Sequence, residues 1–257
     1  MKADPKAALK DRARVVGWGV AIAAAVQGAA AYLAQNHTGA VIAQVVIAEF
    51  GTSRLGVAWS DPLAPMQTGA ELARRALRGV GFGAAAAVIL LGASILAHVA
   101  SVATGTFGVA PLLVGLVISV CAAARDELML RGLVLRALGP NAKLPVQLFV
   151  CGLAGAAFRF GALTEATLAA TLAAVAFSFA ASVAFACLWL RDRGAWLAVG
   201  ANAAFTFVTG PVAQGALLDV RTKTSLDGTI VAVVCGVFFA GSAISYARRN
   251  PSSIGAA

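Results

Sequence analysis

The densest group of charged residues in an apolar context is the run Arg125-Asp126-Glu127-Leu-Met-Leu-Arg131-Gly132. On a helix, Glu127 and Arg131 are four positions apart, so they share a face and can form an ion pair. Asp126 lies one position round the helix, where it could face the interior of a bundle. At membrane depth such a run is a candidate functional site, because ionisable groups there are costly and face protein or water. At a helix end on the cytoplasmic interface, the same charges would simply contact water.

The chain that carries this cluster has the composition of a membrane protein. Of its 257 residues, 60% are hydrophobic and 12% are charged, and the mean hydropathy is +0.85. A soluble domain has about 25% charged and about 45–50% apolar residues. The composition excludes a soluble fold and predicts an all-α, polytopic membrane bundle that forms a single integral-membrane domain over residues 1–257.

Eight apolar segments are candidates for transmembrane helices, since about 20 apolar residues cross the hydrocarbon core. The second segment is the weakest, because it contains Glu49, Gly51 and Arg54, so seven spans are the alternative. The eight segments run over Val15–Ala34, Ala40–Trp59, Gly79–Ala103, Phe107–Ala124, Leu144–Phe160, Ala166–Leu190, Ala195–Ala213 and Thr229–Ala247.

The basic residues predict the orientation of these segments. If the N-terminus is cytoplasmic and the segments alternate, nearly all of the 20 Lys and Arg residues fall on the cytoplasmic side, apart from Arg221 and Lys223 outside and Arg159 within a span. Because cytoplasmic loops carry an excess of basic residues, we expect a multi-pass protein of the cell membrane with both termini in the cytoplasm. In the first cytoplasmic loop, Thr68–Arg78 predicts a short amphipathic helix on the inner leaflet, with Thr68 as its cap.

Composition and spacing indicate few ligands other than lipid. The net charge of +9 comes from scattered short clusters, so it indicates topology and not binding to nucleic acid. The four cysteines lie in apolar stretches without any CxxC or Cys/His spacing, so we expect small buried side chains and no disulfide, metal or cofactor site. The Ala, Gly and Arg bias is typical of a bacterial source.

The charged cluster resembles a known motif. Asp126-Glu127-x-x-x-Arg131-Gly132, followed by Leu133-Val-Leu, is similar to the Glu-Glu-x-x-x-Arg-Gly motif of the CPBP family, the CAAX-processing and bacteriocin-processing intramembrane proteases. The stretch Leu188–Trp196 and the apolar helix after it resemble the segment that leads to the family's last motif. The resemblance covers residues 108–207, which we interpret as a CPBP-like core.

The resemblance implies a site built from a carboxylate that activates water, two histidines and an Asn or similar donor, acting with or without a metal. Asp126 and Glu127 fall at the family's glutamate pair, and Arg131 falls at its arginine. Arg159 stands at the first histidine. Asn202 stands at the second, with Thr206 at the position of the Asn donor.

The departures from this pattern predict a degenerate site. Asp126 is one methylene shorter than Glu, which withdraws the carboxylate by about 1.5 Å and can cost about a hundredfold in rate. Arg159 stays protonated and cannot act as a base. Asn202 cannot exchange a proton near neutral pH. The only two histidines, His37 and His98, fall near the predicted outer ends of the first and third segments.

The substituted residues have structural interpretations as well. Arg159 could pair with Asp126 or Glu127 inside the former catalytic cavity, because a buried charge needs a partner. Alternatively, Arg159 extends to the outer interface. Asn202 and Thr206 are four apart on one helix face and could hydrogen-bond across helices.

These observations leave three functional hypotheses. The first is a pseudoenzyme of the CPBP type that acts as a partner or regulator of another membrane or secreted protein during processing or sorting. The second is an active intramembrane endopeptidase that uses Asp126 and Glu127. The third is a small-solute transporter, although no internal repeat or pair of broken helices favours it.

Overall fold

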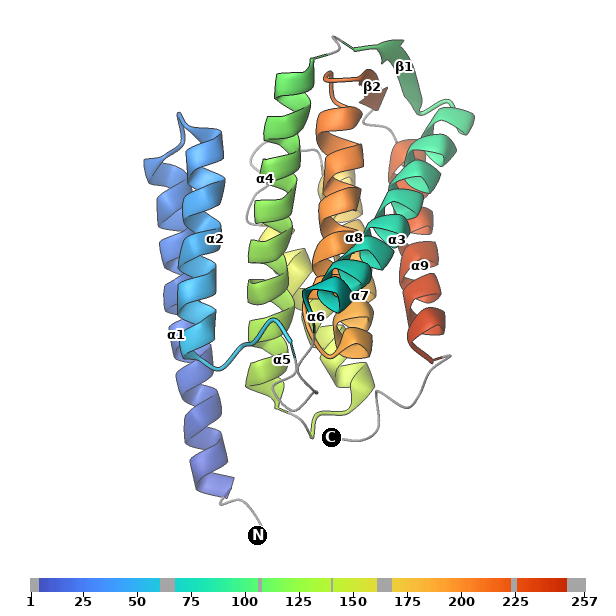
Figure 1. The fold of residues 1–257 in the computed structure, drawn as a ribbon. Coiled ribbons are helices and arrows are strands. Elements are labelled where there is room, and N and C mark those ends of the chain that lie inside the picture. The colour runs from blue at the N-terminus through green and yellow to red at the C-terminus, as the bar shows by residue number, and fades with distance from the viewer. Residues whose placement is uncertain are drawn as a thin grey trace.

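The computed structural model describes residues 5–60, 68–105, 108–139, 141–160, 168–222 and 226–248. Each predicted apolar segment overlaps a helix, which confirms the all-α fold (Figure 1). The α-helices are α1 Pro5–Tyr32, α2 His37–Arg54, α3 Gly69–Leu96, α4 Val109–Glu127, α5 Leu133–Leu138, α6 Leu144–Phe160, α7 Leu168–Asp192, α8 Trp196–Phe207 and α9 Leu226–Arg248.

Five of these helical stretches are long and apolar enough to cross a membrane. They are Leu9–Tyr32, Gly69–Leu96, the continuous stretch Val109–Leu138, Thr171–Asp192 and Gly228–Arg248. Two shorter apolar stretches fall on α6 and α8, and α2 is not among either group. The described helices therefore make a multi-pass membrane protein, but they do not confirm a count of eight spans.

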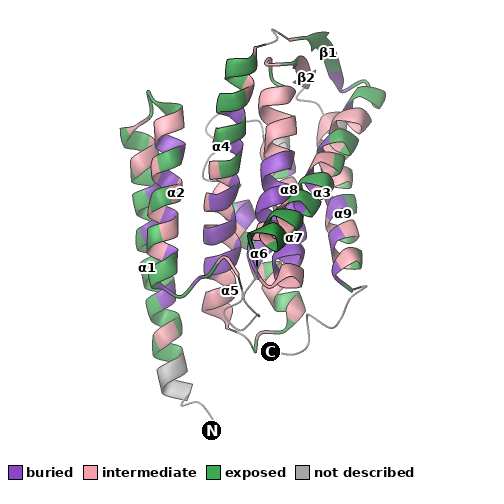
Figure 2. Ribbon diagram, viewed as in Figure 1, coloured by how far each residue is buried: buried purple, intermediate pink, exposed green. Residues whose placement is uncertain are grey.

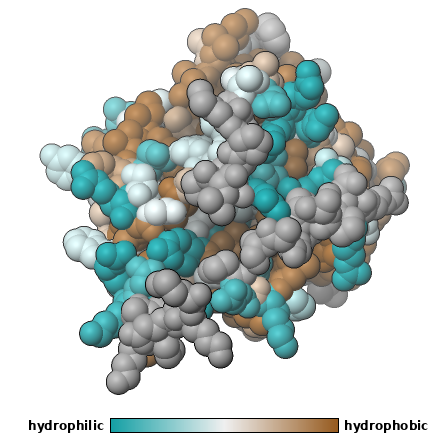
Figure 3. All heavy atoms as spheres, turned by 60° about the horizontal axis from the view of Figure 1, so that its bottom comes forward, coloured by the Kyte–Doolittle hydropathy of each residue, from teal (hydrophilic) through white to brown (hydrophobic). Residues whose placement is uncertain are grey.

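The helices alternate in direction, so α1 begins and α9 ends at the same end of the bundle, the lower end in Figure 1. Seen from that end, hydrophilic side chains gather on the surface and apolar ones lie around the rim (Figure 3). Large apolar side chains such as Val88, Val117 and Phe238 are exposed along the sides of α3, α4 and α9. This distribution suits a bundle whose sides contact lipid and whose ends contact water.

Helix α8 is the centre of the bundle. Every residue from Leu197 to Ala204 is buried, and the helix packs against α3, α4 and α7 (Figure 2). Gly79 and Gly83 of α3 lie directly against the backbone of Leu197 and Ala201. Helices in lipid associate through such close packing of small residues, because lipid offers little hydrophobic drive between helices.

Two predicted boundaries are wrong at the charged cluster and before α3. The fourth segment does not end at Ala124, because α4 continues through the π-helical turn Leu128–Gly132 into α5 and ends at Leu138. The stretch Thr68–Arg78 is not a separate surface helix but the first turns of α3. Thr68 does cap it, in a reciprocal arrangement with Glu71 that satisfies backbone donors at the helix start.

A small antiparallel ribbon replaces the predicted end of the third segment. That segment was expected to reach Ala103, but α3 ends at Leu96 and strand β1 follows over Ala100–Thr104. It pairs with strand β2, Leu218–Thr222, with Val102 opposite Val220. The ribbon joins the chain after α3 to the chain after α8 and its π-helical extension Val208–Val212, at the upper end of the bundle in Figure 1.

The crossing of α3 and α8 gives a matched pair of glycine variants. We expect Gly83→Ala to destabilise the bundle by about 1–3 kcal/mol, because its Cβ would collide with the carbonyl oxygen of Ala201. Gly81→Ala on the same helix meets nothing within 4 Å and should be neutral or slightly stabilising. Thermal unfolding of the purified variants in detergent measures the difference. Equal effects at the two positions would contradict the role of this crossing.

Candidate functional site

Glu127 and Arg131 form the predicted ion pair, and the pair is buried inside the bundle. Arg131 Nη1 lies 3.3 Å from Glu127 Oε1, and the two side chains are 3% and 0% exposed. Glu127 ends α4, and Arg131 lies in the π-helical turn Leu128–Gly132, a rare geometry that is frequent at functional sites. The alternative in which these two charges meet water at a helix end is therefore wrong.

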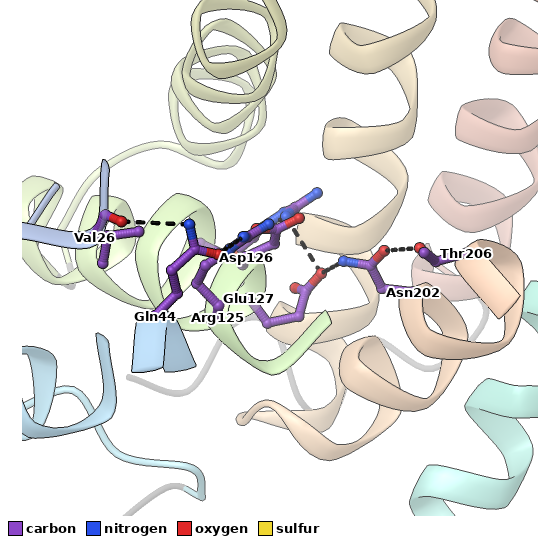
Figure 4. Close-up of polar contacts among 8 residues, drawn as sticks. Val26, Gln44, Arg125, Asp126, Glu127, Asn202 and Thr206 are labelled. Atoms are coloured by element: carbon purple, nitrogen blue, oxygen red, sulfur yellow. Dashed lines mark hydrogen bonds and ion pairs between the residues drawn. The ribbon is translucent and has the colours of Figure 1, made fainter. Parts of the chain in front are cut away.

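Helix α8 supplies a second partner for Glu127. The Asn202 side chain donates a hydrogen bond from Nδ2 to Glu127 Oε1 over 2.9 Å. Thr206 Oγ1 in turn donates to Asn202 Oδ1 over 3.3 Å (Figure 4). Asn202 thus hydrogen-bonds across helices as one interpretation predicted, and it does so at the position where the resembled family carries a histidine.

Helix α7 holds the guanidinium of Arg131. Arg131 Nη2 donates to Ser182 Oγ over 3.1 Å, and the group lies 5.2 Å from the centre of the Phe185 ring. Sequence reasoning missed both partners. Ser182 is an isolated hydroxyl in an apolar helix, and its spacing of three residues from Phe185 is the only signal that they share a face.

The ion pair is held by a single contact between the two groups. Within the part of the chain that the structure describes, Glu127 Oε2 and Arg131 Nε are buried without a hydrogen-bond partner. A bidentate arrangement would have satisfied more of these atoms. The carboxylate therefore keeps one free oxygen, although its charge is already balanced by Arg131.

Asp126 turns away from Glu127. Its Oδ1 lies 2.6 Å from Nη2 of Arg125, whose Nη1 donates to Gln44 Oε1 on α2. Gln44 Nε2 continues the chain to the carbonyl oxygen of Val26 on α1, over 3.3 Å (Figure 4). The two adjacent carboxylates thus serve different networks, one toward α7 and α8 and the other toward α1 and α2. Gln44 and Arg125 were not predicted as part of the site.

A cavity of about 480 Å³ lies beside Asp126, between α1, the α4–α5 stretch and α6. Its walls are largely apolar, and Arg125 and Asp126 supply charge. The Asp126 side chain is 23% exposed. Asp126 therefore borders this space, whereas the fully buried Glu127 is not among its lining residues, and the two carboxylates do not converge on one cavity.

The remaining candidate residues lie elsewhere. Arg159 is in the last turn of α6, but its side chain is outside the part that the structure describes, so its pairing with Asp126 or Glu127 stays a prediction. His37 begins α2 and His98 follows α3, at the end of the bundle opposite to α5 (Figure 1). Among the described residues, no three His, Cys, Asp or Glu side chains come together as a possible metal site.

The second predicted motif, Leu188–Trp196, forms the end of α7 and the turn into α8. Asp192 Oδ2, at the end of α7, accepts a hydrogen bond from the backbone N–H of Leu197 over 3.2 Å and so satisfies a donor in the first turn of α8. Its Oδ1 lies 3.0 Å from Nη1 of Arg75 on α3, and Trp196 Nε1 donates to Ser60 Oγ. These contacts fix the beginning of the helix that carries Asn202.

Comparison with known proteins supports the resemblance over the core of the chain. The family model of the Rce1-like proteins, described as type II CAAX prenyl endopeptidase Rce1-like, matches residues 108–208, which is less than half of the chain. No curated protein and no solved structure gives a match. The match contains the Glu127–Arg131 pair and Asn202. Residues 108–208 are therefore similar to the Rce1-like proteins, in agreement with the resemblance to the CPBP motif.

Proposed function

We propose that this protein is a CPBP-type protease homologue without peptidase activity that acts as a partner or regulator of another membrane or secreted protein during processing or sorting. We further propose that it lies in the cell membrane with both termini in the cytoplasm. The distribution of basic residues along the sequence and the shared end of α1 and α9 support this orientation.

The observation that carries the proposal is the state of Glu127. Its Oε1 is engaged by Arg131 and by Asn202, and no histidine stands beside it. A general base must contact a water molecule and accept its proton, but Glu127 is fully buried away from the cavity beside Asp126, and the amide of Asn202 cannot relay a proton. The arrangement favours a structural role for Glu127.

Asp126 supports the same conclusion from the other side of the helix. Its Oδ1 is engaged by two nitrogens of Arg125, at 2.6 Å and 2.7 Å. Arg125 is tied to Gln44, and its guanidinium lies 5.4 Å from the centre of the Phe158 ring. Each carboxylate of the motif is thus neutralised by its own arginine.

A cleavage assay tests the loss of activity. The purified full chain, reconstituted in vesicles, should not cleave a prenylated peptide with a C-terminal CAAX sequence above the rate in protein-free vesicles. A CAAX endopeptidase in the same vesicles is the positive control, and product formation followed by mass spectrometry is the measurement. Cleavage that is present in the wild type and lost in Asp126→Ala would contradict the proposal.

That contradicting outcome is the second candidate function, an active endopeptidase. One observation favours it, namely that Asp126 is partly exposed beside a cavity of about 480 Å³. In that case Asp126 would have to leave Arg125 and act on a peptide in the cavity.

Stability measurements test the structural role of Glu127. We expect Glu127→Ala to destabilise the protein by about 3–5 kcal/mol, because Arg131 would remain buried without a carboxylate. The double variant Glu127→Gln/Arg131→Met should recover much of this loss. Asp11→Asn, which weakens the more exposed pairs with Arg14 and Arg136, is the control and should have a much smaller effect. A mild effect of Glu127→Ala in detergent unfolding would refute the structural role.

Site-directed cross-linking tests the partner. The cavity beside Asp126 is the expected contact region, and Val16 lines it with 56% of its surface exposed. A photo-reactive amino acid at Val16 should give a discrete cross-linked product in cells, identified by mass spectrometry. The same group at Val237, which is 62% exposed on α9, is the control and should give no such product. Equal products from both positions would count against a specific partner at the cavity.

A further inference from the structure

A groove of about 740 Å³ runs between α1 and α2, separate from the cavity beside Asp126. Its walls come from side chains spaced four apart on each helix, Arg14 and Trp18 on α1 and Val46, Phe50 and Arg54 on α2. Trp18, Val46 and Phe50 are 61%, 60% and 63% exposed. The groove is therefore an open apolar channel on the side of the bundle.

Both positive charges of the groove lie at one end. The two helices are antiparallel (Figure 1), and Arg14 stands early in α1 whereas Arg54 is the last residue of α2. The Arg54 guanidinium lies 4.9 Å from the centre of the Phe50 ring. Asp11 pairs through one carboxylate oxygen with Arg14, at 2.8 Å, and through the other with Arg136. Because a single carboxylate balances two arginines, this end of the groove has a net positive charge.

We propose that this groove binds an anionic phospholipid, with its phosphate between Arg14 and Arg54 and an acyl chain along Trp18, Val46 and Phe50. The occupant must be amphiphilic, because charge is confined to one end and the rest of the wall is apolar. Basic pockets between helices at the cytoplasmic side bind anionic lipid head groups, and guanidinium groups match phosphate oxygens in charge and geometry. The exposed indole of Trp18 suits the interfacial level of a membrane.

The groove does not depend on the proposed function. It lies on a different face of α1 from Val15, Val16 and Gly19, which line the cavity beside Asp126. Ile22 of α1 lies directly against Gly51 of α2, and both residues line the groove. The result of the lipid experiment therefore neither supports nor contradicts the absence of peptidase activity. The result of the peptidase assay likewise does not bear on lipid binding.

Quenching of Trp18 fluorescence tests the proposal. The full chain is reconstituted in phosphatidylcholine vesicles containing a minor fraction of phosphatidylglycerol with brominated acyl chains, and in the reverse mixture with brominated phosphatidylcholine. The Trp18 signal is the difference between the wild type and Trp18→Phe. We expect half-maximal quenching at a much lower fraction of brominated phosphatidylglycerol than of brominated phosphatidylcholine. Arg14→Gln and Arg54→Gln should each weaken this preference about five-fold.

Controls separate the site from a general effect of charge. Arg74→Gln removes an exposed arginine of α3 and should leave the preference unchanged. The double variant Arg14→Lys/Arg54→Lys keeps both positive charges and should retain most of the preference for phosphatidylglycerol. Retention in this variant shows that the loss in the Gln variants comes from the missing charge and not from misfolding. Equal quenching by both lipids would overturn the proposal. So would quenching by neither lipid, which would mean that protein covers the groove, or an unchanged preference in the Gln variants.

Discussion

The buried pair of Glu127 and Arg131 is the constraint around which the core of this bundle is arranged. A charge removed from water must be balanced nearby, and its remaining hydrogen-bonding atoms need polar partners. Asn202 from α8 meets the carboxylate, and Ser182 from α7 meets the guanidinium, so three helices are joined at one point. The two charges balance each other within about one turn, and the helix continues through the charged run to Leu138.

Small residues make this meeting of helices possible. Asn202 has a short side chain, so α8 must lie close to α4 for the amide to reach Glu127. Gly115 of α4 lies against Pro211 at the end of α8, where a Cβ would leave too little room. On the opposite side, Gly79 and Gly83 bring α3 onto α8. Close backbone packing thus sets the distances at which a few polar groups can satisfy one another in an apolar interior.

The sequence was sufficient for the helices and for the charged motif, since long apolar runs and a spacing of four residues are local signals. It failed where the deciding partner is distant. The run from Arg125 to Arg131 resembles a helix end until Ser182 and Asn202 are known to hydrogen-bond to its buried ion pair. The stretch Ala100–Thr104 is apolar enough to continue a helix, but pairing with β2 makes it a strand. Gln44 and Ser182 belong to no sequence motif. The role of a single polar residue in an apolar helix depends on its tertiary partner, which the local sequence does not indicate.

The order of these partners along the chain has a consequence for biogenesis. Asn202 lies 75 residues after Glu127, and Ser182 lies 51 residues after Arg131. During synthesis Glu127 and Arg131 therefore leave the ribosome ahead of both distant partners. Only the neighbour one turn away is on hand to neutralise the carboxylate at that moment. Arg131 thus balances the charge of Glu127 first, and the contacts with α7 and α8 form later, once those helices have been made.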